Sequence, residues 1–390
     1  MLRDKITFMA FPFLSDFRKE LDAKLAPLGA ESVLGLDIGT SSIKIVQIRS
    51  DKERPVLETY GEIELGPYGN ANSGEAVRLS SVKNAAAIVD LLHEVEAKAR
   101  WGGVAVALSS SLVSVVDLPK RDPEQMNRLI RADAKKIIPV AIDQVTLDWF
   151  PIPDEEFTKS AFDRVSSKVP VTIKLQKVFI AATDNEALAE YREIASEANL
   201  RIAFYEIESF SAIRSAADTK NGPVILIDLG ASTTKICISS RDHFTRSART
   251  FDLSGQKMTE KIMKDMALNF SEAEKLKRLD GLSEKSKIAS IIKPDVDQIF
   301  FEAKKIIDLY NSDYKIGISN AVFIGGGACM PGIIPYGSNK LGLPTSAGNP
   351  FDHTSVPMIL EPVLCEAGPK FAVSMGLALR AQSEQPTSQL

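Results

Sequence analysis

This 390-residue sequence has few of the residues that build disulfide frameworks and zinc sites. It contains three cysteines and three histidines, at Cys237, Cys329, Cys365, His93, His243 and His353. They are scattered, with no Cys-x-x-Cys or His-x-x-His pair, so a disulfide scaffold and a structural zinc site are both disfavoured. Cys237 lies in an apolar strand pattern, where a buried free thiol is the usual arrangement. This cysteine usage fits the cytoplasm.

Long hydrophobic runs and an excess of positive charge are missing as well. No stretch approaches the ~18 uninterrupted apolar residues of a membrane-spanning helix. The formal net charge of −4 gives no overall basic field for a nucleic-acid backbone, so we expect no nucleic-acid partner. A composition of 44% hydrophobic and 25% charged residues is ordinary for a soluble globular protein. Because 390 residues exceed one compact core, we expect two lobes.

The N-terminal segment has a charged start followed by the apolar residues 6–14 (ITFMAFPFL). Pro12 interrupts the apolar run, no small-residue cleavage pattern follows, and the chain soon returns to polar helix character. The pattern predicts a helical lead-in over residues 1–30. A partly disordered arm and a surface-seeking amphipathic anchor remain alternatives.

One short acidic turn appears twice, as residues 36–42 (LDIGTSS) and residues 227–234 (IDLGASTT). Each copy lies in an apolar, β-branched run, which predicts strand, tight turn and strand. Gly39 and Gly230 let the main chain approach an anion closely, and the serines and threonines offer donors to phosphate oxygens. A single Asp-x-Gly turn most often serves hairpin geometry alone. The repetition in a matched context is what indicates two similar lobes facing one nucleotide.

Asp37 and Asp228 stand at the strand ends of these turns. Magnesium favours oxygen ligands and keeps several waters, so one carboxylate from each side would hold a hydrated ion against the phosphates. Lys44 would offset phosphate charge.

A third element is the apolar strand 321–324 that runs into residues 325–332 (GGGACMPG). Three consecutive glycines leave no Cβ to obstruct a flat ring or a phosphate. The loop fits neither the dinucleotide fingerprint nor the Walker lysine loop, and alone it would also suit a flexible turn.

In this order the two acidic turns and the triple-glycine loop resemble the phosphate-1, phosphate-2 and adenosine motifs of the actin-like ATPase superfamily, which includes actin, sugar kinases, DnaK-type chaperones and FtsA. Within it, residues 31–382 are similar to the PilM family of type IV pilus assembly proteins. The segments that carry this likeness are 105–111 (AVALSSS), 116–119 (VDLP), 134–139 (AKKIIP), 251–259 (FDLSGQKMT), 273–277 (AEKLK), 343–345 (LPT), 349–351 (NPF) and 375–380 (MGLALR). Leu253 and Ser254 depart from the family's loop pattern, which usually includes glycine there.

The resemblance implies an α/β, actin-like (ribonuclease H-like) two-lobed ATPase fold with a small inserted 1C-type subdomain, and ATP and Mg²⁺ as cofactors. Asp37 and Asp228 would hold Mg²⁺ through water. The catalytic candidates are Asp37, Asp228 and Glu208. Glu206 and Glu208 lie where some superfamily members place a Mg²⁺-side acid in the inter-lobe connection, and a core-edge or solvated position is at least an equal alternative for both. The expected nucleotide-binding residues are Asp37, Gly39, Thr40, Ser41, Ser42, Lys44, Asp228, Gly230, Ser232, Thr233, Thr234, Gly255, Glu274, Lys277, Gly325, Gly326 and Gly327.

The same resemblance and the pattern changes along the chain predict the domain organisation. The expected units are a lead-in (1–30), the first lobe (31–103), an inserted 1C-like subdomain (104–184), a return to the first lobe (185–220), the second lobe (221–345), a second return (346–381) and a disordered tail (382–390). A helix is expected over 81–100 and strands over 104–108 and 171–182.

As a member of this family, the chain would be a nucleotide-responsive adaptor that binds the cytoplasmic N-terminal tail of a PilN-like inner-membrane protein. It would be cytoplasmic, peripheral at the inner membrane through that partner, at most a slow ATPase, and able to self-associate into a ring. The alternative is an FtsA-like polymerising ATPase. A sugar kinase is disfavoured, because no base beyond the phosphate-site aspartates is aimed at a substrate hydroxyl.

Overall fold

The computed structural model describes residues 32–51, 54–152, 175–240 and 245–384. The first lobe is a five-stranded sheet of β1 (Ser32–Ile38), β2 (Ser42–Arg49), β3 (Val56–Glu64), β4 (Trp101–Val106) and β8 (Arg201–Ile207), in the order β3-β2-β1-β4-β8. Its helices are α2 (Ser81–Glu94), α4 (Asn185–Glu197), α5 (Glu208–Ala216), α10 (Glu361–Ala367) and α11 (Ala372–Ser383). β1, β2 and β3 are antiparallel, whereas β4 and β8 run parallel to β1.

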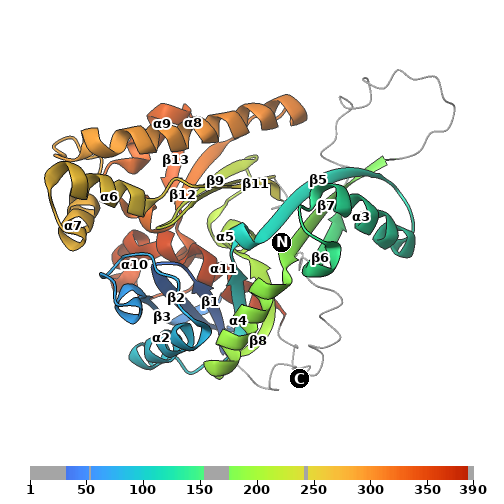
Figure 1. Cartoon of the computed structure of the whole chain (residues 1–390), viewed down its shortest axis with the longest axis horizontal. Coiled ribbons are helices and arrows are strands. Elements are labelled where there is room, and N and C mark those ends of the chain that lie inside the picture. The colour runs from blue at the N-terminus through green and yellow to red at the C-terminus, as the bar shows by residue number, and fades with distance from the viewer. Residues whose placement is uncertain (1–31, 52–53, 153–174, 241–244, 385–390) are drawn as a thin grey trace.

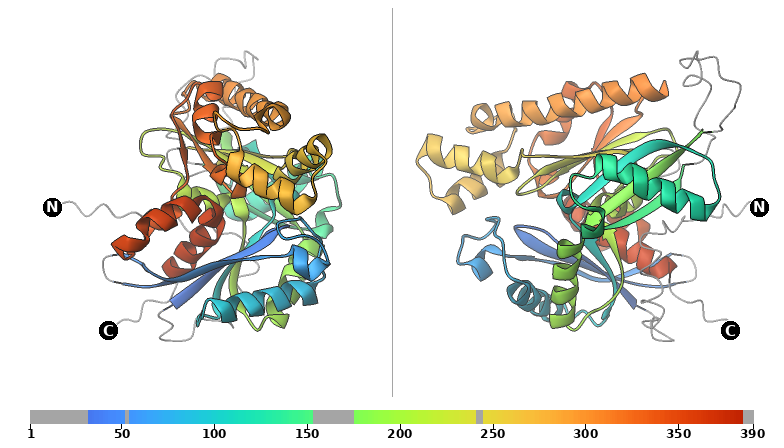
Figure 2. Two further views of the ribbon diagram at one scale, coloured as in Figure 1. Left: turned by 90° about the vertical axis from the view of Figure 1, so that its left-hand side faces the viewer. Right: turned by 45° about the vertical axis from the view of Figure 1, so that its right-hand side comes forward.

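The second lobe repeats this design. Its sheet contains β9 (Val224–Leu229), β10 (Thr234–Ser239), β11 (Thr245–Phe251), β12 (Asn320–Ile324) and β13 (Thr345–Ala347), in the order β11-β10-β9-β12-β13. Its helices are α6 (Gly255–Met266), α7 (Phe270–Asp280), α8 (Ala289–Tyr314) and α9 (Ile333–Leu341). The two lobes lie one above the other (Figures 1 and 2).

Alternation along the strands decides which helices cover each face of the first sheet. Leu34 and Leu36 of β1 pack in one core with α2 and α4, whereas Val33 packs in another with α5 and α11. That second core also contains Leu226 of β9. Helices α5 and α11 therefore lie between the two sheets and join the lobes. Cys237 of β10 is a buried free thiol in the same core, as predicted.

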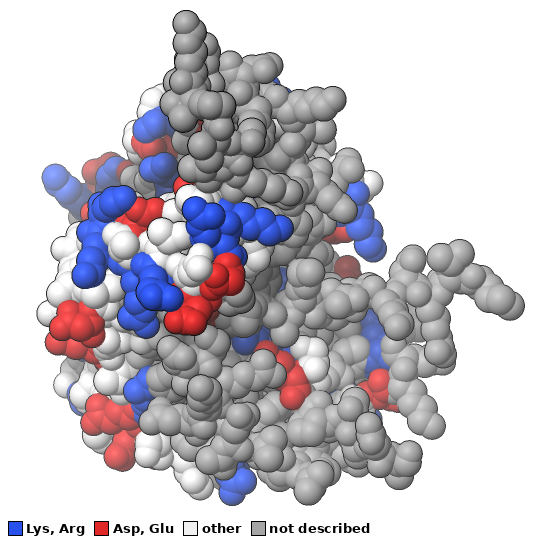
Figure 3. All heavy atoms as spheres, turned by 90° about the vertical axis from the view of Figure 1, so that its right-hand side faces the viewer, with Lys and Arg blue, Asp and Glu red and all other residues white. Residues whose placement is uncertain are grey.

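The inserted subdomain is a three-stranded antiparallel sheet with one helix. It contains β5 (Ser111–Pro119), α3 (Pro123–Ile137), β6 (Val145–Pro151) and β7 (Leu175–Asp184), in the sheet order β5-β7-β6, and lies to one side of both lobes (Figure 2). A short 3₁₀ turn, η3 (Leu108–Ser110), connects β4 to β5. The described surface on this side carries Lys and Arg next to Asp and Glu (Figure 3).

Three predicted boundaries are wrong. The strand expected at 104–108 within the inserted subdomain is β4, a fully buried strand paired on both sides within the first lobe. The helix expected over 81–100 ends at Glu94, because Glu96 adopts a left-handed φ of 52° and the chain then enters β4. Helix α11 also continues to Ser383, past the predicted start of the tail.

Some expectations concern residues that are not described. The predicted lead-in over 1–30, residues 171–174 of the predicted strand and residues 385–390 of the tail lie outside the described ranges. Among the described residues, no helix is long and apolar enough to cross a membrane.

The close approach of α11 to the first sheet depends on glycine. An added Cβ at Gly35 of β1 would lie 1.9 Å from the backbone oxygen of Ser374, and one at Gly376 would lie 1.8 Å from that of Ser211. We expect Gly35→Ala to lower the free energy of unfolding by about 3 kcal/mol, because backbone must move to admit the methyl group. Urea denaturation measures this loss. Gly317→Ala is the control, since a Cβ there meets nothing within 4 Å; equal losses in both variants would contradict the packing argument.

Candidate functional site

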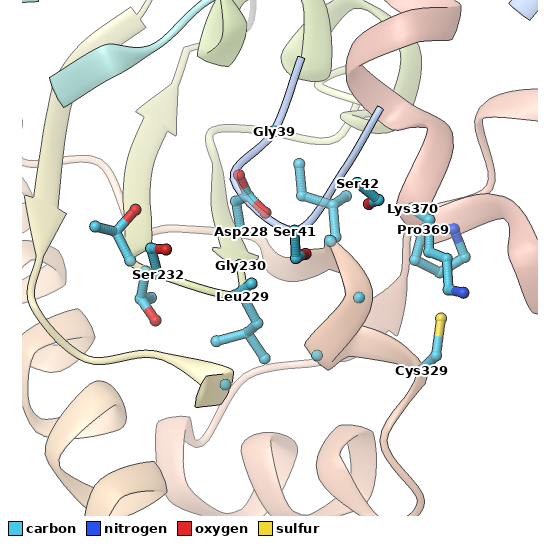
Figure 4. A pocket seen from close by; sticks show the side chains of 18 of the residues that line it. Gly39, Ser41, Ser42, Asp228, Leu229, Gly230, Ser232, Cys329, Pro369 and Lys370 are labelled. Carbon is cyan, nitrogen blue, oxygen red and sulfur yellow. The ribbon is translucent and has the colours of Figure 1, made fainter. Parts of the chain in front are cut away.

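A cavity of about 560 Å³ lies between the two lobes and receives residues from both sheets. All the residues that the sequence predicts for nucleotide, metal and catalysis, Glu208 included, line it. Figure 4 shows the turn with Gly39, Ser41 and Ser42 on one side and Asp228, Gly230 and Ser232 on the other. The structure therefore brings together segments that are nearly two hundred residues apart in the sequence.

The two acidic turns have the same geometry. In the first, the Gly39 N–H donates to the Ser42 carbonyl at 3.1 Å, and in the second the Gly230 N–H donates to the Thr233 carbonyl at 3.1 Å. The turns also touch, because the Ser232 hydroxyl donates to the Thr40 hydroxyl at 2.8 Å. The two lobes thus present matching hairpin tips to one space.

Antiparallel pairing places a lysine opposite each of the two aspartates. β1 and β2 pair Asp37 with Lys44, and β9 and β10 pair Asp228 with Lys235. Lys235 was missed in the sequence analysis, although it follows Asp228 by seven residues, as Lys44 follows Asp37. That shared spacing is the signal by which it would have been found.

The lysines have different partners. Lys44 Nζ donates to the Ser42 hydroxyl at 2.7 Å and lies 3.6 Å from Glu62 Oε1. Lys235 Nζ lies 2.7 Å from Glu208 Oε2 and 3.3 Å from Asp228 Oδ2. Burial disfavours the charged form of Lys235, yet the carboxylates of Glu208 and Asp228 raise its pKa above its usual value.

Desolvation in the cleft controls the ionisation of Asp37. It raises the pKa of Asp37 to about 6, against the attraction of Lys44. Glu62, which sequence reasoning also missed, behaves in the opposite way. Although burial opposes ionisation, Lys44 and Lys370 hold the pKa of Glu62 at about 2.

The triple-glycine loop packs directly on the second hairpin. Gly325 has a φ of +80°, and a Cβ there would lie 2.4 Å from Asp228 Oδ1. A Cβ at Gly327 would lie 2.6 Å from Leu229 Cβ, whereas one at Gly326 would meet no atom of the chain within 4 Å. Only glycine fits at positions 325 and 327, and position 326 leaves the cavity open.

Glu274 and Lys277 form the opposite wall with the start of α6. Lys277 Nζ donates to the Gly255 carbonyl at 2.8 Å and lies 2.6 Å from Glu274 Oε2, which also accepts the Thr259 hydroxyl proton at 2.5 Å. Burial opposes ionisation of Glu274, but Lys277 keeps the pKa of this carboxyl below its usual range. The wall is therefore polar and internally paired.

The two glutamates of the inter-lobe connection, Glu206 and Glu208, have different surroundings. Glu208 lines the cavity, whereas Glu206 does not. Glu206 is fully buried in an ion cluster, with Arg214 Nη2 at 2.7 Å and Arg380 Nη1 at 2.8 Å from Oε1. Of the alternatives for Glu206, the structure favours a position in the core, because two arginines pair with its carboxylate and it does not line the cavity.

The donor set of the cavity suits magnesium only in its hydrated form. Within the described ranges, no group of three or more His, Cys, Asp or Glu side chains is placed to enclose a metal ion. Mg²⁺ usually keeps several waters and takes one or two carboxylates together with substrate phosphates. Asp37 and Asp228 with the hydroxyls of the two turns fit that kind of site.

Comparison with known proteins gives one family and several related folds. The chain matches the family model described as type IV pilus assembly protein PilM over residues 35–382. It is similar to the structure of a PilM-PilN type IV pilus biogenesis complex, with 25% identity, a TM-score of 0.74, and coverage of 90% of this chain and 98% of that chain.

Two more distant structures show the fold alone. They are the ethanolamine utilization protein EutJ from Carboxydothermus hydrogenoformans (14% identity, TM-score 0.52, 93% and 94% covered) and MreB5 of Spiroplasma citri bound to ADP (10% identity, TM-score 0.51, 91% and 98% covered). Together these likenesses confirm the predicted actin-like α/β fold.

The ion cluster of Glu206 has a testable pH dependence. Although burial opposes its ionisation, Arg214 and Arg380 lower the pKa of Glu206 from 4.5 to about 2. A lowered folded-state pKa stabilises the fold above pH 4.5, and this contribution is lost as pH falls toward 2. We therefore expect Glu206→Gln to cost about 3 kcal/mol in urea denaturation at neutral pH, and less as pH falls below about 4.

Glu384→Gln is the matched control. Glu384 accepts a hydrogen bond from Arg380 Nε at 2.8 Å, but its side chain is partly exposed. We expect this variant to lose less than about 1 kcal/mol. A pH-independent cost for Glu206→Gln would contradict the assigned ion cluster.

Proposed function

Because this chain belongs to the PilM family of type IV pilus assembly proteins, we propose that it is a nucleotide-responsive adaptor that binds ATP with Mg²⁺ between its lobes. The observation that carries the proposal is the pair of equivalent hairpins whose turns meet at Ser232 and Thr40. Paired turns that line one cavity with small residues and hydroxyl groups suit a polyphosphate. The triple-glycine loop beside them leaves room for a flat ring.

Most of the predicted residues have a role in this proposal. Thr40, Ser41 and Ser42 would bind phosphate oxygens from the first lobe, and Ser232, Thr233 and Thr234 would bind them from the second. Lys44 would neutralise phosphate charge, and Gly255, Glu274, Lys277 and the glycines at 325–327 would face the adenosine. Asp37 and Asp228 would hold Mg²⁺ through water, and the ion would neutralise phosphate charge.

We expect slow hydrolysis at most. The Leu108 N–H donates to the Glu208 carboxylate at 2.7 Å, and this hydrogen bond weakens Glu208 as a general base even when Lys235 has another partner. Nucleotide therefore acts chiefly as a ligand whose different affinities for open and closed lobes shift the clamp.

Replacing either aspartate tests the nucleotide site. We expect Asp37→Ala and Asp228→Ala each to abolish retention of Mg-ATP, because each removes a carboxylate beside the metal and phosphates. Isothermal titration with a non-hydrolysable ATP analogue measures the loss. Asp252→Ala is the control, since its side chain is 83% exposed and does not line the cavity.

Unchanged binding in both variants would contradict the assigned site.

The same purified protein distinguishes the adaptor from a polymerising ATPase: slow phosphate release without nucleotide-dependent sedimentation supports the adaptor. Filaments that pellet on addition of ATP would reject it. Sedimentation at equilibrium also tests self-association into a ring.

We further propose that the partner is the cytoplasmic N-terminal tail of a PilN-like membrane protein, which would hold the chain at the inner membrane. A groove of about 630 Å³ lies between β5 of the inserted subdomain, β11 of the second lobe and the end of α8. Both β5 and β11 are edge strands of their sheets. Edge strands offer backbone donors and acceptors to an extended peptide, so this groove suits a peptide that adds a strand.

A substitution on the rim of the groove tests this placement. Leu309 of α8 lines the groove and is 51% exposed, so Leu309→Asp should leave the fold intact and weaken binding of a synthetic PilN-like tail peptide by about tenfold. Fluorescence anisotropy of the labelled peptide measures the affinity. Phe301→Asp is the matched control, because Phe301 is 57% exposed on the same helix but outside the groove. Equal affinities for the two variants would place the peptide elsewhere.

A further inference from the structure

Lys235 connects three parts of the molecule through one ammonium group. It lies on β10 of the second lobe, and its Nζ contacts Asp228 of the second hairpin and Glu208 at the start of α5. The side chains of all three residues are mostly buried, with 19%, 15% and 10% exposed for Lys235, Asp228 and Glu208. A contact with so little water around it is weakly screened. If Lys235 loses or exchanges a partner, the electrostatic energy of Asp228 and Glu208 therefore changes.

Glu208 carries the connection on to the inserted subdomain. While Oε2 pairs with Lys235, Oε1 accepts the backbone N–H of Leu108 at 2.7 Å. Leu108 is the first residue of the 3₁₀ turn that leads from β4 into β5. It also packs in the small core that joins the inserted subdomain to α5, with Phe179 of β7 and Phe210 of α5. One carboxylate thus links the cleft to the base of the inserted sheet.

The same groups face the cavity. Asp228, Lys235, Glu208, Ala107 and Ser109 all line it. An ammonium has three N–H donors, and among the described residues Lys235 gives hydrogen bonds to two carboxylates. A phosphate group placed beside the second hairpin competes for this ammonium, because it offers more negative charge than either carboxylate.

We propose that Lys235 senses the terminal phosphate of the bound nucleotide and transmits its presence to the inserted subdomain through Glu208 and the Leu108 amide. This inference rests on the proposed nucleotide site and adds its regulation. When a triphosphate is bound, Lys235 turns to the phosphate, and Glu208 is left as an unneutralised carboxylate beside it. Repulsion between the two moves Glu208, and with it the Leu108 turn from which β5 begins.

The coupling is reciprocal. A ligand that fixes the inserted subdomain in the position favoured by the triphosphate must raise the affinity for triphosphate by the same factor. A diphosphate, which does not extend to Lys235, leaves the pairing with Glu208 in place. The contact between Lys235 and Glu208 therefore distinguishes ATP from ADP, and the difference changes the position of the inserted subdomain, which borders the proposed peptide groove.

Hydrogen–deuterium exchange on the full chain tests the proposal with three probes: Mg²⁺ alone, Mg²⁺ with ADP, and Mg²⁺ with the non-hydrolysable analogue AMPPNP. In the wild-type protein, both nucleotides should protect the hairpins at 37–44 and 228–235. Of the three probes, only Mg²⁺ with AMPPNP should change the exchange rate over 108–119 and 175–184, by about fivefold. The Lys235→Met variant should keep the hairpin protection and lose the AMPPNP-dependent change over 108–119 and 175–184. Its affinity for AMPPNP should fall by about tenfold, and its affinity for ADP should fall less.

A second variant guards against misfolding of the first. Glu208→Gln keeps the size of the side chain and an oxygen that accepts the Leu108 N–H, but it removes the charge that repels the phosphate. It should bind both nucleotides and lose the change over 108–119. Lys257→Met is the control; Lys257 is 46% exposed on α6 and outside the cavity, and its variant should behave as the wild type.

The outcomes separate the two proposals. Hairpin protection in every variant, with the change at 108–119 still present in Lys235→Met or Glu208→Gln, would overturn the sensor and leave the nucleotide site standing. Hairpin protection in the wild type without any change in the exchange rate at 108–119 would also overturn the sensor and leave the nucleotide site standing. Failure of both nucleotides to protect the wild-type hairpins would overturn the nucleotide site itself, and the sensor with it.

Discussion

The cross-strand pairing of an aspartate with a lysine, next to a glycine turn, is the constraint on which this structure depends. A carboxylate that is withdrawn from water is costly unless a cation or hydrogen-bond donors accompany it. In each lobe the antiparallel register places a lysine opposite the aspartate, as Lys44 opposite Asp37 and Lys235 opposite Asp228. Lys235 lies 3.3 Å from Asp228, whereas Lys44 attracts Asp37 without overcoming the desolvation that raises the pKa of this carboxyl.

The helices between the lobes pack against both sheets and bring the two hairpins to one cavity. Glycines at positions 35 and 376 allow backbone to contact backbone, so α11 lies closer to β1 and α5 than side chains would permit. Glu206 ties these elements together, because its carboxylate receives Arg214 from α5 and Arg380 from α11. The guanidinium of Arg380 also lies 4.0 Å from the centre of the Phe204 ring, which shields the cluster from water. This buried cluster is structural, and the acid beside it that faces the cleft is Glu208.

The difference between Lys44 and Lys235 gives the cleft its asymmetry. Lys44 is held by residues of its own sheet, Ser42 and Glu62, so it responds only within the first lobe. Lys235 instead reaches from the second lobe to Glu208, which belongs to the connection and touches the base of the inserted subdomain. Matching hairpins therefore have unequal consequences. Lys44 stays within its own sheet, and Lys235 joins the cleft to the inserted subdomain, which borders the groove between β5, β11 and α8.

Local residue patterns were enough to identify the hairpin elements and most of the residues that line the cleft. Turn chemistry and apolar runs act over a few residues, so the two Asp-x-Gly hairpins and the triple-glycine loop could be found without coordinates. The partners of charged residues that are far apart in the sequence follow from the fold and could not be read from local patterns. Glu206 and Arg380 meet across 174 positions, and Lys235 meets Glu208 across 27, because the fold places their strands and helices side by side. β4 belongs to the first lobe for the same reason. Its place between β1 and β8 depends on neighbouring strands, which the local sequence pattern does not contain.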